Sequence, residues 1–371
     1  MSNAIMIRKL PPVWFVQALN GFRSGLTWLN GKLFPSSIVL YERFLFFWFL
    51  PALRVAAELD IAGILEKEPK TIGELATLTG SDPVALLRLM RALASQRVFK
   101  KRKDGRYVNT SLSKVLVEGK GSLRYMVMQH LGTINWSVFN DLSYSVRSGK
   151  SAFSKVFGKK IYEFLAENPE ESILFDKSMT NLTEIGIEPF LSAYNFRKCR
   201  TIADIGGGEG LLLASILYIN KNATGILFDL PEGLNNANNI LRKYGVHDRV
   251  KIIEGNFFDF VPEGYETYLL KNILHNWGDA DCIRILSNTR RSMMENGKIL
   301  ILEMMLDEGN KASFGKLLDL QMMVFMESGK ERTRKEFEIL LGQSGLLINR
   351  IIPTIAPFSI IEAVKNRTRE Q

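Results

Sequence analysis

The chain has 371 residues, enough for two domains and a large core. An apolar content of 46% is typical of a soluble globular protein, and two distant cysteines, Cys199 and Cys282, indicate free thiols in a reducing compartment rather than a metal cluster. The first residues lack the pattern of a signal peptide, and the longest apolar run, 44–53, is too short to span a bilayer. We therefore expect a cytoplasmic protein.

The net charge is +9, with basic residues concentrated in the first 50 positions and in 100–103. Such a balance could suit nucleic acid or an anionic surface. Solvated basic faces are common and weakly specific, so we expect no nucleic-acid partner.

Residues 1–50 form an N-terminal extension with a regular apolar stripe. Its members are four and three residues apart in alternation and share one side of a predicted helix: Phe15, Leu19, Phe22, Leu26, Leu29 and Leu33. Such a stripe packs either on the protein's own core or on a second subunit. Because basic residues lie nearby, peripheral contact with a membrane surface is the alternative.

Residues 51–115 predict a small winged-helix module. Thr71 and Glu74 form a capping box, Asp82 and Pro83 open a second helix, and the Asp104-Gly105 turn joins two strands of a hairpin. Winged helices bind DNA or mediate dimerisation. The hydrophobic helices before it and the enzyme-like region after it favour a homodimer formed through this N-terminal domain.

Residues 116–195 read mostly as helix, a linker that could shape a pocket, and residues 196–371 alternate strand and helix. The expected strands are Thr201–Ile205, Thr224–Phe228, Val250–Glu254, Thr267–Leu270, Lys298–Glu303, Leu347–Ile352 and Phe358–Ala363. Helices between the earlier strands predict an α/β fold with a doubly wound parallel sheet of seven strands, the last antiparallel. Ligands of such sheets bind at the carboxyl ends of the strands.

The segment from Asp204 to Gly210 joins the first of these strands to a helix through four glycines, three of them Gly206, Gly208 and Gly210. Glycines let a backbone approach a ligand closely, and the helix start offers free amide donors. The spacing is G-x-G-x-G, with Leu211 where a dinucleotide fingerprint has its third glycine. The loop therefore predicts a nucleotide-like ligand without a pyrophosphate.

Further candidate ligands follow the next strands. Asp229 ends the second strand and could accept both hydroxyls of a ribose, or cap the segment that starts at Pro231. Asn256 offers an amide to an adenine edge after the third strand, and Phe257 offers an apolar surface to its face.

His275 follows the fourth strand on the cofactor side and is the candidate base. An imidazole is the natural side chain to take a proton near pH 7. Glu303 ends an apolar strand, and a carboxylate beside a histidine fixes its tautomer. Glu331 could serve likewise or be a surface charge. His247 reads as a surface residue, and His130 as core or pocket.

Several ordered motifs resemble the S-adenosylmethionine-dependent O-methyltransferases of the caffeate, hydroxyindole and hydroxyneurosporene type. They cover the chain from about residue 40 to its end: 55–109, 204–210, 228–231, 255–258, 270–277, 300–303, 329–333 and 336–337. The resemblance implies a Rossmann-like class I methyltransferase domain behind a winged-helix dimerisation domain. It also implies S-adenosylmethionine as cofactor, S-adenosylhomocysteine as product and no metal.

The resemblance also assigns roles. Asp204 and the three glycines hold the methionine part of the cofactor, Asp229 its ribose, Asn256 and Phe257 its adenine, and Lys271 helps to hold it. His275 is the general base, flanked by Glu303 and Glu331. Phe175, Met179 and Met322 line the acceptor pocket, although helix core explains those three almost as well.

Three positions depart from the family pattern: Asn256 and Asn276 replace a common Asp, and Met326 replaces a polar residue of some plant enzymes. The expected activity is methyl transfer to a hydroxyl of a small aromatic or polyketide-like acceptor. The alternatives are a hydroxylase or decarboxylase of the same fold that does not transfer methyl, and a ligand-sensing winged-helix DNA-binding protein.

Overall fold

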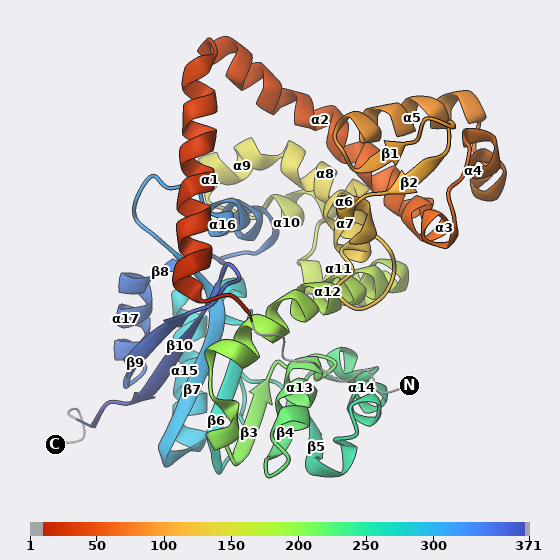
Figure 1. The fold of residues 1–371 in the computed structure, drawn as a ribbon. Helices are drawn as coiled ribbons and strands as arrows, with labels where there is room; N and C mark the ends of the chain where they lie inside the picture. The colour runs from red at the N-terminus through yellow and green to blue at the C-terminus, as the bar shows by residue number, and fades with distance from the viewer. Residues whose placement is uncertain (1–9, 368–371) are drawn as a thin grey trace. The chain divides into compact units, whose positions relative to one another are not determined.

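A computed structural model describes residues 10–367 and divides them into two compact units (Figure 1). One unit, called the sheet unit here, comprises 10–20, 141–161 and 185–367. The other, the helical unit, comprises 21–140 and 162–184. The domain boundaries expected from the sequence, at 50, 115 and 195, stay predictions.

The sheet unit is built on one large twisted sheet. Its strands are β3 (Thr201–Ile205), β4 (Thr224–Asp229), β5 (Val250–Glu254), β6 (Tyr265–Lys271), β7 (Met293–Leu306), β8 (Arg332–Thr333), β9 (Leu346–Pro353) and β10 (Phe358–Lys365). The order is β5-β4-β3-β6-β7-β10-β9, and the short β8 pairs with β7. Strands β3 to β7 are parallel, while β10 runs antiparallel to both β7 and β9.

This topology confirms the predicted seven-stranded sheet with an antiparallel last strand. Two details differ. Strand β7 begins at Met293, before the expected Lys298, and β8 was not predicted because two residues carry no alternation of their own. Strand β8 pairs Arg332 with Met305 near the end of β7, which brings the segment before Arg332 to the carboxyl edge of the sheet.

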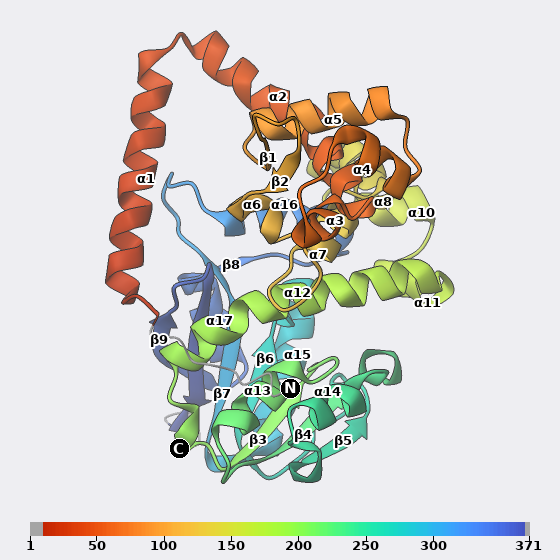
Figure 2. The same ribbon diagram turned by 45° about the vertical axis from the view of Figure 1, so that its right-hand side comes forward.

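Helices connect the strands of this unit. They are α9 (Leu142–Ser148), α10 (Ala152–Phe157), α13 (Leu211–Ile219), α14 (Ala237–Lys243), α15 (Asp279–Ser292), α16 (Phe314–Phe325) and α17 (Arg334–Gln343), with 3₁₀ turns at Phe196–Lys198, Pro231–Leu234, His247–Arg249 and Leu274–Asn276. Figures 1 and 2 both show α13 and α14 beside β3, β4 and β5. Helix α13 buries seven of its nine residues, from Leu211 to Leu217, which fixes the start of this helix under the glycine loop.

The helical unit contains the module expected from the sequence. Its elements are α2 (Ser36–Glu58), α3 (Ile61–Lys67), α4 (Ile72–Thr79), α5 (Pro83–Ser95), β1 (Phe99–Lys101), β2 (Tyr107–Asn109), α6 (Ser111–Lys114), α7 (Arg124–His130), α8 (Thr133–Asn140) and α11 (Ile161–Glu167). Thr71 and Glu74 cap α4 reciprocally, and Asp82 caps α5. Strands β1 and β2 form the antiparallel hairpin, so the helix, helix, hairpin order is confirmed.

Two long helices run through both groups of residues. Helix α12 (Pro169–Ala193) and helix α1 (Val13–Leu33) each contain residues of both units. Helix α1 buries none of its residues. No helix within residues 10–367 is long and apolar enough to cross a membrane.

Candidate active site

The glycine loop is a tight turn between β3 and α13. Gly206, Gly208 and Gly210 have φ values of +66°, +56° and +79°, a conformation that favours glycine. The amide of Gly206 donates to the carbonyl of Phe228 at 2.8 Å, which ties the loop to β4. Gly207 has no space for a side chain, because a Cβ atom there would lie 2.5 Å from Leu227 Cδ1. Leu227 therefore fills the space on one side of the Gly207 backbone, and a ligand can approach the loop from the side away from Leu227.

Asp204 and Lys271 form a charged pair at the ends of β3 and β6. Burial raises the pKa of the Asp204 carboxyl to about 7, although the positive charge of Lys271 acts against this rise. Burial likewise lowers the pKa of Lys271 to about 8, opposed by Asp204. Asp204 Oδ2 is buried and has no hydrogen-bond partner in the described residues. A cationic or hydrogen-bond-donating ligand group would satisfy it.

Asp229 is held at the end of β4 by backbone amides. Its Oδ2 accepts from the Gly208 amide and its Oδ1 from the Leu230 amide, both at 2.7 Å. Burial raises the pKa of Asp229, while these two hydrogen bonds act to lower it. Each carboxylate oxygen has a second lone pair, so the residue can still accept two hydroxyls of a ribose.

Asn256 and Phe257 lie on the turn after β5. Asn256 Oδ1 accepts the amide of Phe258 at 2.9 Å, so this side chain fixes its own turn. The ring of Phe257 packs edge-on against Trp277, with centroids 6.0 Å apart. A Cβ atom on Gly206 would lie 3.7 Å from Phe257 Cε1, which places the ring beside the glycine loop. The loop, Asp229 and Phe257 therefore lie close together, and their roles toward a cofactor stay predictions.

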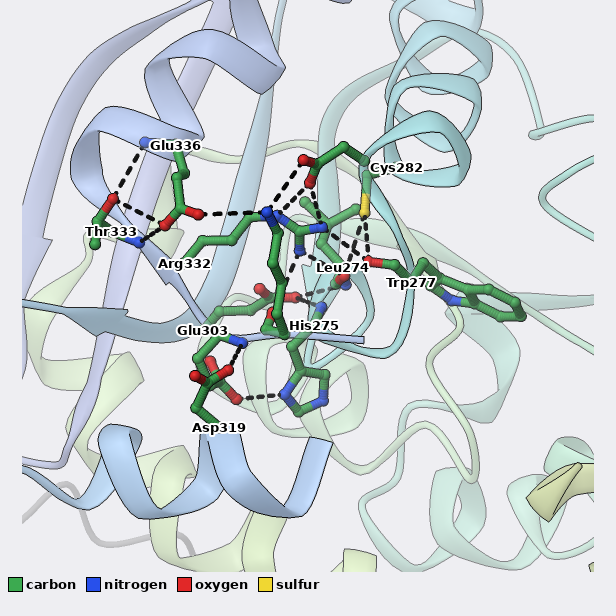
Figure 3. A network of polar contacts seen from close by, with 12 residues as sticks. Leu274, His275, Trp277, Cys282, Glu303, Asp319, Arg332, Thr333 and Glu336 are labelled. Carbon is green, nitrogen blue, oxygen red and sulfur yellow. Dashed lines mark hydrogen bonds and ion pairs between the residues drawn. The ribbon is translucent and has the colours of Figure 1, made fainter. Parts of the chain in front are cut away.

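His275 sits on a buried 3₁₀ turn after β6. The turn begins at Asn272, whose φ is +53°. His275 Nδ1 lies 2.7 Å from Glu331 Oε1, and both side chains are almost wholly buried (Figure 3). Burial alone would lower the pKa of His275, but the hydrogen bond to Glu331 and the charges of Glu303 and Glu331 outweigh it and raise the pKa.

The two glutamates have different contacts. Glu303 was expected to flank the imidazole, and its Oε1 accepts the backbone amides of Ile273, Leu274 and His275 at 3.1, 2.6 and 3.2 Å. Among the described residues, Glu331 bonds the ring. Glu303 flanks the histidine on the backbone side, where it holds the turn and acts on the ring through its charge. A strand-end carboxylate can reach ring or backbone, and the sequence does not distinguish the two.

Arg332 was missed by the sequence reasoning and is the largest fully buried side chain described. It donates to the carbonyls of Leu274 and Trp277, each at 2.8 Å, and to Asp279 Oδ1 (Figure 3). Arg332 thus holds the histidine turn by donating to the carbonyls of the turn, and Glu303 holds the same turn by accepting from its amides. An arginine between Glu331 and Thr333 reads as a surface charge, and no local pattern in the sequence indicated that it would be buried.

The acceptor-pocket residues are not brought together in one unit. Met322 is buried on α16 of the sheet unit, while Phe175 and Met179 lie half-buried on α12 in the helical unit. Their roles stay predictions. His130 lies in the helical unit and contacts the Met126 carbonyl of its own helix, and His247 lies beside Asp248 at the surface.

A glycine loop on β3, an acidic residue ending β4 and a buried histidine after β6, all at one sheet edge, define a class I methyltransferase that uses S-adenosylmethionine. An O-methyltransferase domain matches residues 139–347, and an O-methyltransferase dimerisation domain matches 41–119. The chain belongs to this family of S-adenosylmethionine-dependent O-methyltransferases.

Relatives extend over most of the chain. Phenazine O-methyltransferase PhzM of Lysobacter antibioticus is 38% identical over 330 residues, 89% of this chain and 96% of the relative. The solved structure of LaPhzM matches with a TM-score of 0.85 and 37% identity over 90% of this chain and all of that one. The solved structure of the O-methyltransferase NcsB1, in complex with S-adenosylmethionine and 2-hydroxy-5-methyl naphthoic acid, matches with a TM-score of 0.72 and 28% identity, over 85% and 96% of the two chains.

Proposed function

We propose that this enzyme methylates a hydroxyl of a small aromatic or polyketide-like acceptor, with His275 as general base. The single observation that carries the assignment is the 2.7 Å contact between His275 Nδ1 and the buried Glu331 carboxylate. A carboxylate at Nδ1 selects the tautomer that carries its proton there, which leaves Nε2 free to accept one.

The chain's own groups supply alignment and proton removal. When bound, S-adenosylmethionine supplies an activated methyl group. His275 Nε2 takes the proton of the acceptor hydroxyl as its oxygen bonds the methyl carbon, and Glu331 stabilises the imidazolium that results. The products are a methyl ether and S-adenosylhomocysteine.

The residues at the sheet edge fit this cofactor. We propose that Asp204, Lys271 and the loop of Gly206, Gly208 and Gly210 hold its methionine part. Asp229 takes the ribose, and Asn256 and Phe257 the adenine. The buried, unpartnered Oδ2 of Asp204 supports this arrangement, because it needs a donor that the ammonium of the cofactor can provide.

The acceptor class rests on relatives that act on aromatic molecules, such as the phenazine enzyme and the naphthoic acid complex. An aromatic hydroxyl is acidic enough for one imidazole to deprotonate. A screen of phenols, quinols and hydroxynaphthoates with methyl-labelled S-adenosylmethionine tests the class. Label recovered as a methyl ether supports it, and turnover without labelled product would favour the non-methylating alternative.

Replacement of His275 by Ala tests the base. We expect the cofactor dissociation constant to stay within about twofold and kcat to fall about 10²- to 10⁴-fold. His247→Ala is the matched control, because His247 lies at the surface beside Asp248. Turnover of H275A equal to that of H247A would refute the assignment.

We further propose a homodimer formed through the region that matches the dimerisation domain, 41–119. Sedimentation equilibrium of the full chain tests it, since a monomer at micromolar concentration would exclude it. The expectations of no nucleic-acid partner and of a cytoplasmic location stay predictions. Absence of duplex binding at low salt would remove the DNA-binding alternative.

A further inference from the structure

Helix α1 carries an apolar surface that nothing in the described chain covers. Its stripe residues range from 43% exposed at Phe15 to 69% at Leu33. Apolar side chains that share one face of a helix normally bury most of their surface against another part of the protein or a partner. The sequence left open whether the stripe packs on the protein's own core, and no residue of α1 is buried within the described residues.

The geometry of the stripe suits another helix. Phe15, Leu19, Phe22, Leu26, Leu29 and Leu33 follow steps of four and three over 19 residues, the spacing of a coiled-coil seam. The opposite side of α1 carries Asn20, Ser24 and Thr27 and also Trp28, which is 65% exposed. A continuous seam of this period packs along a facing helix rather than into a compact pocket.

The exposed surface continues into the first half of α2. There Leu40, Phe44, Phe46, Phe47 and Trp48 are each more than half exposed. At 100° per residue Leu40, Phe44, Phe47 and Trp48 lie within about 100° of one another on one face of the helix, and Phe46 points away from that face. The first half of α2 thus continues the one-sided apolar surface of α1, the form that packs along a facing helix.

This surface adjoins the dimerisation region. The match to the O-methyltransferase dimerisation domain begins at residue 41, within α2. Helix α1 lies before that match and is joined to α2 through Phe34 and Pro35 (Figure 1). Uncovered apolar side chains thus run without a break from α1 into a segment that belongs to the dimerisation domain.

We propose that α1 and the first half of α2, residues 13–48, form an arm that packs on a second copy of this chain. The inference rests on the proposed homodimer and extends its interface beyond the part shared with the family. In a symmetric dimer each arm is covered by the partner, so the apolar area of both copies is buried at once.

A cavity beneath the arm's base supports the same occupant. It has a volume of about 330 Å³ and is lined by Phe47, Pro51, Val55, Leu131 and Trp136 and by the ion pair of Arg54 with Glu58. The Nε atom of Arg54 is buried there without a hydrogen-bond partner. Side chains of a second copy would fill this space where the arm meets the rest of the helical unit.

A charge placed in the seam tests the proposal on the full chain. Phe22→Glu puts a carboxylate in the stripe, while Ser24→Glu puts the same charge on the opposite side of the same helix. We expect F22E to raise the dimer dissociation constant at least about tenfold by sedimentation equilibrium and S24E to change it less than about threefold. Circular dichroism and cofactor binding of both variants should match the native chain, because α1 buries no residue.

The outcomes separate the arm from the homodimer. A native chain that is monomeric overturns both proposals. A dimeric native chain with equal dissociation constants for F22E and S24E overturns the arm alone. Flotation of the native chain with phosphatidylserine vesicles, lost in F22E while the dimer is unchanged, would assign the stripe to a membrane and also overturn the arm.

Discussion

Replacement of Glu331 by Gln separates the two charges that raise the pKa of His275. The native pKa lies above the ordinary value of 6.5, so the acidic limb of kcat/KM, where the base becomes neutral, lies above pH 6.5. E331Q removes the stronger of the raising contributions, so the limb should move to lower pH. Because the imidazolium is also less stabilised, kcat should fall roughly tenfold or more at its plateau.

The measurement is a pH–rate profile with the cofactor saturating. E303Q provides a comparison in which the ring keeps its hydrogen bond, so its acidic limb should shift less than that of E331Q. An unchanged limb in E331Q would mean that His275 is not the titrating base.

Arg332 predicts a stability effect at a single residue. R332M removes the guanidinium bonds to the carbonyls of Leu274 and Trp277 and to Asp279, and leaves the Cys282 thiol as a weak donor to both carbonyls. Each hydrogen bond lost from a charged donor in a buried site costs about 1–3 kcal/mol. We expect the free energy of unfolding to drop by about 3 kcal/mol in urea titrations. Arg334→Met is the control, because Arg334 is exposed and pairs only with Glu338 along its helix, an interaction worth about 0.5 kcal/mol. Equal losses in both variants would contradict the role of Arg332.

At the scale of residues, the sequence predicted where the candidate site residues lie better than which partners they contact. Gly206, Asp229 and His275 follow from position at strand ends, and the structure places them at one edge. The partners of Glu303 and Arg332 depend on how the 272–278 turn folds back between β7 and β8. That turn is set by tertiary contacts, which no local pattern in the sequence records.

At the scale of elements, the segment before β8 packs on the histidine turn and sets the position of Glu331 relative to the ring of His275. A Cβ atom on Gly329 would lie 2.7 Å from the carbonyl oxygen of His275, so the segment before β8 touches the histidine turn directly. G329A should push Glu331 away from the ring. We expect kcat to fall at least about tenfold, because small misplacements of catalytic groups are costly, while cofactor affinity changes little.

Steady-state kinetics and calorimetric titration of the cofactor check this expectation. Gly342→Ala is the matched control, since nothing lies within 4 Å of a Cβ atom at this position on α17. The prediction fails if G329A keeps native kcat, or if it loses kcat and cofactor affinity together.

Elements with strong local signals were predicted closely. The capping box at Thr71, the Asp104-Gly105 hairpin and strand β3 match the structure within a residue or two. Strand β8 was missed because its two residues form a strand only through pairing with β7. The stripe of α1 was recognised as a packing surface, but a single chain contains no partner to complete it.

At the scale of the whole molecule, the chain responds to two separate mass-action effects. The proposed cofactor ligands lie in the sheet unit, and most of the arm lies in the helical unit. S-adenosylhomocysteine at about 100 times its dissociation constant adds about 2.7 kcal/mol to the unit that binds it. Protein concentration stabilises whichever unit holds the dimer interface, because dissociation accompanies its unfolding.

We therefore expect two calorimetric transitions in the full chain. The Tm of the transition of the sheet unit should rise with S-adenosylhomocysteine, and the Tm of the other transition should rise with protein concentration. Two compact units of one chain can unfold in separate transitions. Asp229→Ala should abolish the first response and leave the second, while F22E should leave the first response and lower the Tm of the second transition at a given protein concentration. A single transition that moves with both variables would show that the two units unfold together, which would make the dimer interface part of the stability of the catalytic site.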